Sequence, residues 1–251
     1  MERNVKALAI VINNKRINEL DRQLTLLCEK LGIIDVIIYG AQKSNKALKV
    51  PLYTQANFSL YFNGKKYSLK DVEVIEANEH ISTNLETIFA ASLISEIAML
   101  DSSLEDIYTL VLLAIAAINK DNYKMVLIQY ILTYIRLAGY EVDYISCPLC
   151  SRKYTEEETL GFNSSIKASV CLNCDDFNQS FILPKNARRF LRDSNKSDFS
   201  SSLNFKISSI MQERIFNYLT RYLKQIFSIE LRCLSSGVFN ILDKEIKWNI
   251  N

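Results

Sequence analysis

Two Cys-x-x-Cys pairs constrain the fold of this chain more than any other feature. Cys147 is followed by Cys150, and after twenty intervening residues Cys171 is followed by Cys174. Each pair directs two thiolates at one ion, so this spacing predicts a tetrahedral structural zinc site with one ion per chain. The alternative is a pair of disulfides, which requires an oxidising compartment.

Four thiolate ligands fill the coordination shell of zinc and leave no open position for a catalytic water. The metal is therefore expected to hold the fold together. One divalent ion and four thiolates carry a net charge of about −2. Lys153 and Lys167, which lie inside the cysteine loop, are candidates to offset that charge.

Enzymatic signatures are absent from the sequence. The six glycines form neither of the two glycine-rich nucleotide-binding motifs. The single histidine, His80, is followed by Ile81 and Ser82, so the H-x-E motif of the zinc-dependent nucleic-acid deaminases is missing. A metal-dependent nuclease would have to use carboxylates such as Asp175 and Asp176, which are residue types common by chance. The chain is expected not to be an enzyme.

The N-terminus opens with charged residues and a short apolar run, without the features of a secretory signal. No run of eighteen apolar residues is present, so a membrane span is not expected. These features predict a cytoplasmic protein, whose reducing environment favours zinc over disulfides. Cys28 and Cys233, outside the pairs, are interpreted as core residues.

Charge is strongly segregated along the chain, although the net charge is only +2. Residues 13–70 hold ten Lys and Arg against four Asp and Glu, and residues 180–226 hold nine against three. Residues 71–179 hold six against seventeen. Two basic zones beside an acidic body favour a polyanionic partner, and solvated faces are the alternative.

The hydrophobic pattern changes period near residue 80. Before it, five short β-rich runs predict a small barrel, for which the OB-fold is one five-stranded architecture. After it, Thr83 is the expected N-cap of a first helix, with Leu85 and Ile88 on its apolar face. Further helices are expected over 104–119, 121–138 and 205–227, the second of them capped by Asp121 and ended by Gly139.

The expected fold is therefore α+β: an N-terminal five-stranded OB-fold barrel, followed by an all-helical domain that carries a four-cysteine zinc finger. The expected domains are residues 1–80 for the barrel, 81–142 with 180–251 for the helical domain, and 143–179 for the finger.

Basic residues in the predicted barrel turns are the first candidates for contacts with nucleic acid, because lysine-rich loops around a barrel track a phosphate backbone. They are Lys15, Arg16, Lys43, Lys46, Lys49, Lys65 and Lys66. A second candidate is a short helix after Pro184 with Arg188, Arg189 and Arg192, for which an exposed solvated face is the alternative. The aromatic residues available for base stacking, with core packing as the alternative, are Tyr39, Tyr53, Phe58 and Tyr61.

The chain resembles the bacterial RecO family of DNA recombination mediators over nearly its full length. The matching segments, in order, are LAIVI, INELDRQLTLLCEKLG, VIIYGAQK, LAGYEVDYISCPLC, VCLNC, ARRFLR and LRCLSSGVFNIL. The chain departs from the family pattern where Gln42 replaces an arginine, where Lys46 and Ala47 replace a Ser-Arg pair, and where Asn18 replaces a turn glycine.

The resemblance implies an OB-fold, a helical domain and a zinc finger in a nucleoid-associated protein without enzymatic turnover. It also implies binding of single- and double-stranded DNA, annealing of complementary strands, and work with RecR to load RecA onto strands covered by single-strand-binding protein. The alternative function is a zinc-stapled protein-interaction scaffold without direct DNA activity.

Overall fold

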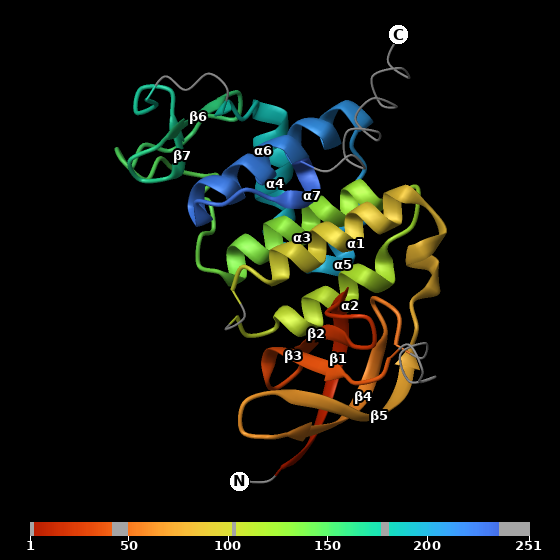
Figure 1. Cartoon of the computed structure of the whole chain (residues 1–251). Coiled ribbons are helices and arrows are strands. Elements are labelled where there is room, and N and C mark those ends of the chain that lie inside the picture. Colours follow the sequence, from red (N-terminus) through yellow and green to blue (C-terminus); the bar gives the residue numbers. More distant parts are fainter. Residues whose placement is uncertain (1–2, 42–49, 102–103, 177–180, 236–251) are drawn as a thin grey trace. The chain divides into compact units, whose positions relative to one another are not determined.

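The computed structural model describes residues 3–41, 50–101, 104–176 and 181–235. Contacts divide the chain into two compact units, one of residues 1–120 with the residues from 233 onward and one of residues 121–232 (Figure 1). The first unit thus extends beyond residue 80, where the barrel was expected to end. The domain bounds given above stay a prediction.

Five strands form a closed barrel in the first unit, as the sequence predicted. They are β1 (Asn4–Arg16), β2 (Arg22–Cys28), β3 (Gly32–Ile38), β4 (Gln55–Phe62) and β5 (Tyr67–Glu76). Their order around the barrel is β1-β2-β3-β5-β4. The β3–β5 pair is parallel and the others are antiparallel. This confirms the expected fold class, an OB-fold barrel followed by helices.

Strand β1 pairs with both of its neighbours in the closed barrel, β4 and β2. Residues 4–10 of β1 pair with β4, and residues 9–16 pair with β2. A register shift between Val11 and Asn13 interrupts the second ladder. A bulge of this kind bends a strand and increases its twist, which lets one long strand turn the corner of a small barrel.

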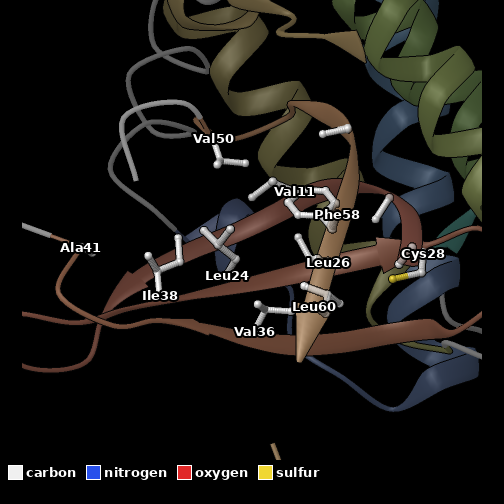
Figure 2. Packing of buried hydrophobic residues seen from close by; sticks show 13 residues of the cluster. Val11, Leu24, Leu26, Cys28, Val36, Ile38, Ala41, Val50, Phe58 and Leu60 are labelled. Carbon is white, nitrogen blue, oxygen red and sulfur yellow. The ribbon is translucent and has the colours of Figure 1, made fainter. Parts of the chain in front are cut away.

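Alternating apolar residues fill the barrel. Figure 2 shows their side chains converging from several strands. Leu24 and Leu26 of β2, Val36 of β3, and Phe58 and Leu60 of β4 are almost fully buried. This period-two pattern places one face of each strand in the barrel core, and in β1 and β2 parts of the other face, such as Ile10 and Leu27, are buried as well.

Two helices complete the described part of the first unit, α1 (Leu85–Ala98) and α2 (Ile107–Ala117). The expected cap of α1 was wrong by one residue: Asn84 is the N-cap and accepts a hydrogen bond from the amide of Thr87. Thr83 instead ends a 3₁₀ turn, η2 (Glu79–Thr83). Leu85 and Ile88, expected on the apolar face, are exposed.

The second unit is built from helices and one hairpin. Its elements are α3 (Tyr123–Leu137), β6 (Leu160–Asn163), β7 (Ala168–Cys171), α4 (Lys185–Ser194), α5 (Phe199–Ser202) and α6 (Ser209–Phe227), and a short helix α7 (Arg232–Ser235) follows them. Helices α3 and α6 pack together. The N-cap of α3 is Asn122, not Asp121, whereas Gly139 follows the helix with a φ of 78°, as expected.

No helix in the described ranges is both long and apolar enough to cross a lipid bilayer.

Candidate nucleic-acid interface and candidate metal centre

The β1–β2 loop, residues 17–21, is built around the side chain of Asn18. Its Oδ1 accepts hydrogen bonds from the amides of Leu20 (2.8 Å) and Asp21 (2.7 Å). Such side-chain turns fix a short loop without requiring a glycine. At the base of the loop, Arg16 donates to the carbonyl groups of Asn18 (2.9 Å) and Glu19 (3.2 Å). Arg16 is thus held at the edge of the barrel.

The β4–β5 loop, residues 63–66, is also built around an asparagine side chain. Asn63 Oδ1 accepts from the amides of Lys65 (3.0 Å) and Lys66 (2.9 Å), and Gly64 takes a φ of 95° that favours glycine. Both lysine side chains are exposed. The turn therefore presents two adjacent cations to solvent.

The end of β3 connects the two loops. The amide of Gly40 donates to Asp21 Oδ1 (2.8 Å) in the β1–β2 loop. Val36 and Ile37 pair with Tyr67 and Ser68, the residues that directly follow the β4–β5 loop. Both loops consequently border the end of β3. We call them the two basic loops, counting with the β1–β2 loop the cations of the strand ends that adjoin it, Lys15 and Arg16 of β1 and Arg22 of β2. In OB-folds these same two loops, with the β2–β3 face between them, bind oligonucleotides and oligosaccharides.

Cations line this edge of the barrel. Lys15, Lys65 and Lys66 are exposed, and none forms an ion pair within the part of the chain that the structure describes. Arg22 pairs directly opposite Arg16 in the β1–β2 ladder and adds another positive charge, which our sequence reasoning missed. The strand register identifies Arg22 as a neighbour of Arg16, and this register cannot be read from the composition.

The four candidate stacking residues differ clearly in how exposed their side chains are. Tyr53 and Phe58 are buried and belong to the core, and Tyr61 is half-buried with Lys70 Nζ 5.7 Å from the centre of its ring. Tyr39 is 62% exposed and lies at the end of β3, between the two basic loops. Of the four, Tyr39 is the one positioned to stack on a base.

Three of the predicted basic residues, Lys43, Lys46 and Lys49, lie outside the described residues. The same holds for Gln42 and Ala47.

The four paired cysteines form one cluster in the second unit. Their sulfur atoms all lie within 4.8 Å of one another, and Cys150 Sγ and Cys171 Sγ are 3.8 Å apart. A tetrahedral zinc ion with sulfur at about 2.3 Å places its ligands about 3.8 Å from each other. All six cysteines are free thiols, so the pairs are not disulfides. The residues present therefore fit a four-thiolate metal ion.

Two turns shape the cluster. In the first, which we call the knuckle (residues 144–156), the amide of Ser151 donates to the carbonyl of Cys147 (2.8 Å), and the amide of Cys147 donates to the carbonyl of Arg152 (2.9 Å). In the second, which follows β7, the amide of Cys174 donates to the carbonyl of Cys171 (2.9 Å). The β6–β7 hairpin supports the second turn.

Local electrostatics favour thiolate formation at Cys147. Burial acts to raise the pKa of this thiol, but the backbone N–H groups of Cys171, Cys150 and Leu149 lower it to about 6. The pKa of Cys174 is raised to about 12, first by its interaction with the Cys171 side chain. Close thiols thus share their protons unequally, and a bound metal releases them.

One cation that interacts with the cluster, Arg152, was missed by our sequence reasoning. Arg152 pairs with Glu158, and it also interacts with the Cys171 side chain; both interactions raise the pKa of Arg152. Of the two lysines proposed for this role, Lys167 donates instead to Ser228 Oγ (3.1 Å). A guanidinium partly offsets the negative charge of a thiolate cluster, as hydrogen-bonding neighbours of metal ligands commonly do.

Comparison with known proteins places this chain beside DNA repair proteins. The model of the family "Recombination protein O N terminal" matches residues 1–78, which cover the barrel. A protein named DNA repair protein RecO from Thermoanaerobacter sp. (strain X514) is 25% identical over 245 residues, which are 92% of this chain and 95% of that protein. This chain is similar to the RecO proteins.

Two further relatives carry the same name. DNA repair protein RecO of Mycoplasma capricolum is 25% identical over 252 residues, which are 94% of this chain and 98% of the relative. DNA repair protein RecO of Clostridium novyi is 20% identical over 247 residues, which are 95% of this chain and 94% of the relative. The similarity to RecO proteins thus extends through the barrel, the metal centre and the helices.

The arginine helix is the main correction to the nucleic-acid contacts predicted from the sequence. Arg188 was expected to contact nucleic acid, with an exposed solvated face as the alternative, but it is only 1% exposed. Arg189 lies 3.7 Å from Glu157, and Arg192 lies 2.8 Å from Glu156. The physical reason is helical spacing, since Ala187 and Leu191 turn the same side of α4 toward the core. The guanidinium of Arg188 is not available to a phosphate.

Proposed function

We propose that this protein is a recombination mediator in DNA repair. It binds single- and double-stranded DNA through the barrel and anneals complementary strands. It works with RecR to load RecA onto strands covered by single-strand-binding protein. The RecO relatives named above support the general role in DNA repair. None of these steps is an enzymatic turnover.

The observation that carries DNA binding is the placement of both basic loops at the end of β3. Lys15 and Arg16 lie at the end of β1, directly before the first loop, and Lys65 and Lys66 lie in the second loop. Cations that contact phosphates neutralise them and release their counterions. Tyr39 lies between them and offers a ring for stacking on a base.

The experiment is a titration of labelled single-stranded oligonucleotide at several salt concentrations. Each phosphate contact on a single strand contributes about 0.7 to the slope of log K against log salt. Replacing both Lys65 and Lys66 with alanine should weaken binding and reduce the slope by about 1.4. The matched control is Lys30→Ala in the β2–β3 turn, at the end of β2 remote from the two loops, which should leave the slope unchanged.

Two outcomes would contradict this interface. The first is a parent protein that does not bind oligonucleotide at low salt but retains protein partners, which would favour the scaffold function. The second is an equal loss of binding in the Lys65→Ala/Lys66→Ala variant and the Lys30→Ala control, in which case affinity would come from diffuse charge.

We also propose that Cys147, Cys150, Cys171 and Cys174 hold one structural zinc ion per chain. The approach of the four sulfur atoms to within 4.8 Å supports this assignment. When bound, zinc would crosslink the knuckle to the turn after β7. Structural zinc contributes on the order of 10 kcal/mol to folding in small modules, so replacing Cys150 or Cys171 with serine should release the metal and unfold the finger. Elemental analysis of the purified protein tests the stoichiometry.

A further inference from the structure

Arg188 is the largest fully buried side chain in the described part of the protein. It projects from α4 and donates to the backbone carbonyl of Tyr144 (3.0 Å) on one side of the knuckle. On the other side it donates to the carbonyl groups of Thr155 and Glu156. One guanidinium therefore joins both ends of the segment that carries Cys147 and Cys150.

A tyrosine lies between Arg188 and the sulfur atoms. The guanidinium carbon is 5.6 Å from the centre of the Tyr154 ring. Tyr154 packs against the cluster formed by Cys147, Val170, Cys171 and Cys174. Its amide also donates to the carbonyl of Ile145 (2.8 Å), which closes the knuckle from within. Arg188, Tyr154 and Cys147 thus form a continuous chain of contacts from helix to metal centre.

Burial of the Arg188 guanidinium costs free energy, which argues that the side chain has a specific structural role. Burying a cation is expensive unless it is paired, and in the described residues no carboxylate lies within ion-pair distance of Arg188. Its Nε has no hydrogen-bond partner there. Three carbonyl groups stabilise the charge instead. The planar guanidinium holds its donors in a fixed fork that reaches carbonyls on two sides at once, whereas a lysine ammonium is a compact point charge whose three donors share one nitrogen.

From this geometry we propose that Arg188 is a positioning residue for the metal centre: it fixes the knuckle in the conformation that presents Cys147 and Cys150 to the ion. The proposal rests on the zinc site proposed above. It also assigns to α4 a role in metal retention, in place of the DNA contact expected from the sequence. The second pair, Cys171 and Cys174, is held by the β6–β7 hairpin and does not depend on Arg188.

The test compares Arg188→Lys with the parent and with Arg189→Lys. Arg189 is the adjacent residue of α4 and contacts only side chains, those of Asn186 and Glu157, so its replacement keeps charge and helix position without touching the knuckle. The first measurement is the rate of zinc transfer to a chromogenic chelator. Loss of a supporting contact typically weakens metal binding by about tenfold to a hundredfold, so we expect Arg188→Lys to speed transfer by at least about tenfold. Arg189→Lys should match the parent.

A second measurement separates positioning from general destabilisation. Alkylation of each cysteine is followed by mass spectrometry in the zinc-loaded protein. In Arg188→Lys, Cys147 and Cys150 should react before Cys171 and Cys174, while Cys28 in the barrel core stays protected as in the parent. If all the thiols became reactive together, Arg188 would only support the fold and the proposal would be wrong.

The two proposals fail in different ways. A parent protein that contains no zinc removes the metal site itself. A parent that holds zinc and releases it at the same rate as Arg188→Lys leaves the metal site intact and overturns the role of Arg188.

Discussion

At the scale of single residues, two asparagines shape the β1–β2 and β4–β5 loops through side-chain hydrogen bonds to the backbone. Asn18 and Asn63 each accept from two backbone amides in the basic loops. This explains how Asn18 stands where the RecO pattern has a turn glycine without disturbing the loop. With asparagine at this position, side-chain hydrogen bonds form the turn in place of glycine, and the cations at the base of the loop keep their positions.

Tyr39 gives the first prediction at this scale. Stacking of one base on an aromatic side chain contributes about 1–3 kcal/mol, so Tyr39→Leu should weaken binding of single-stranded DNA by about tenfold. Tyr39→Phe keeps the ring and should bind like the parent. Fluorescence anisotropy with a labelled oligonucleotide measures both. Equal weakening by the two variants would mean that the hydroxyl, and not the ring, makes the contact.

Asp21 gives a prediction about pH. Hydrogen bonds from the Asn18 side chain and from the Gly40 amide lower the pKa of Asp21 below its ordinary value. Because the folded-state pKa is depressed, the stabilising contribution is present above the ordinary pKa. It is lost as the pH falls through the lower, folded-state value. The link between the β1–β2 loop and Gly40 should therefore persist at pH 5 and loosen only in more acidic solution.

The Gly40 amide resonance reports this link directly. In an NMR titration, its shift should move with a midpoint below the ordinary aspartate pKa of about 3.9. Asp21→Asn keeps an acceptor oxygen but cannot titrate, so its Gly40 resonance should not move over this range. A midpoint at or above the ordinary value would show that the hydrogen bond does not persist in solution.

At the scale of elements, the β6–β7 hairpin is matched closely to the second cysteine pair. A methyl group added at Gly161 would lie 2.5 Å from Cγ and 2.8 Å from Cβ of Asp175. Asp175 directly follows Cys174, and its carboxylate accepts from the amide of Phe162 (3.2 Å). Gly161 is therefore needed for the close approach of β6 to the metal-binding turn.

This close approach predicts that Gly161→Ala destabilises the finger and weakens metal retention. Overpacking of this kind typically costs about 1–3 kcal/mol. Asp175→Ala removes the Cγ and carboxylate atoms that clash but keeps Cβ, so it relieves part of the clash, and the double variant should be more stable than Gly161→Ala alone. Thermal unfolding and chelator competition on the parent, the two single variants and the double variant give the coupling free energy between the two residues. Strictly additive effects would mean that the two residues do not meet.

The order and type of the elements were predictable, whereas the orientation of particular side chains was not. Period-two runs identified five strands, and period changes placed the helices near 107–117, 123–137 and 209–227. The N-cap of α1 was missed by one residue because the adjacent residues Thr83 and Asn84 are both good N-caps. For Arg188, a run of arginines suggested an exposed helix, but the core side of α4 is set by tertiary packing.

At the scale of the whole molecule, the two proposed functions reside in different compact units. The basic loops lie in the unit that contains the barrel, and the four cysteines lie in the unit of residues 121–232. The sequence predicted both sites through their residue types. It did not reveal which cations border the end of β3, because that depends on the parallel β3–β5 pairing, a contact between residues about thirty positions apart.

This separation predicts that metal and DNA binding can be uncoupled. In a Cys171→Ser/Cys174→Ser variant, zinc should be lost and the finger should unfold, because the remaining two thiols cannot complete the coordination shell. The barrel has its own core and its own hydrogen-bonded loops, so affinity for single-stranded DNA should stay within about threefold of the parent and keep the same salt slope. Circular dichroism, zinc content and anisotropy on the same samples measure the three properties. A large loss of affinity with an intact barrel would place DNA contacts in the finger, and the interface would then have to extend beyond the two basic loops.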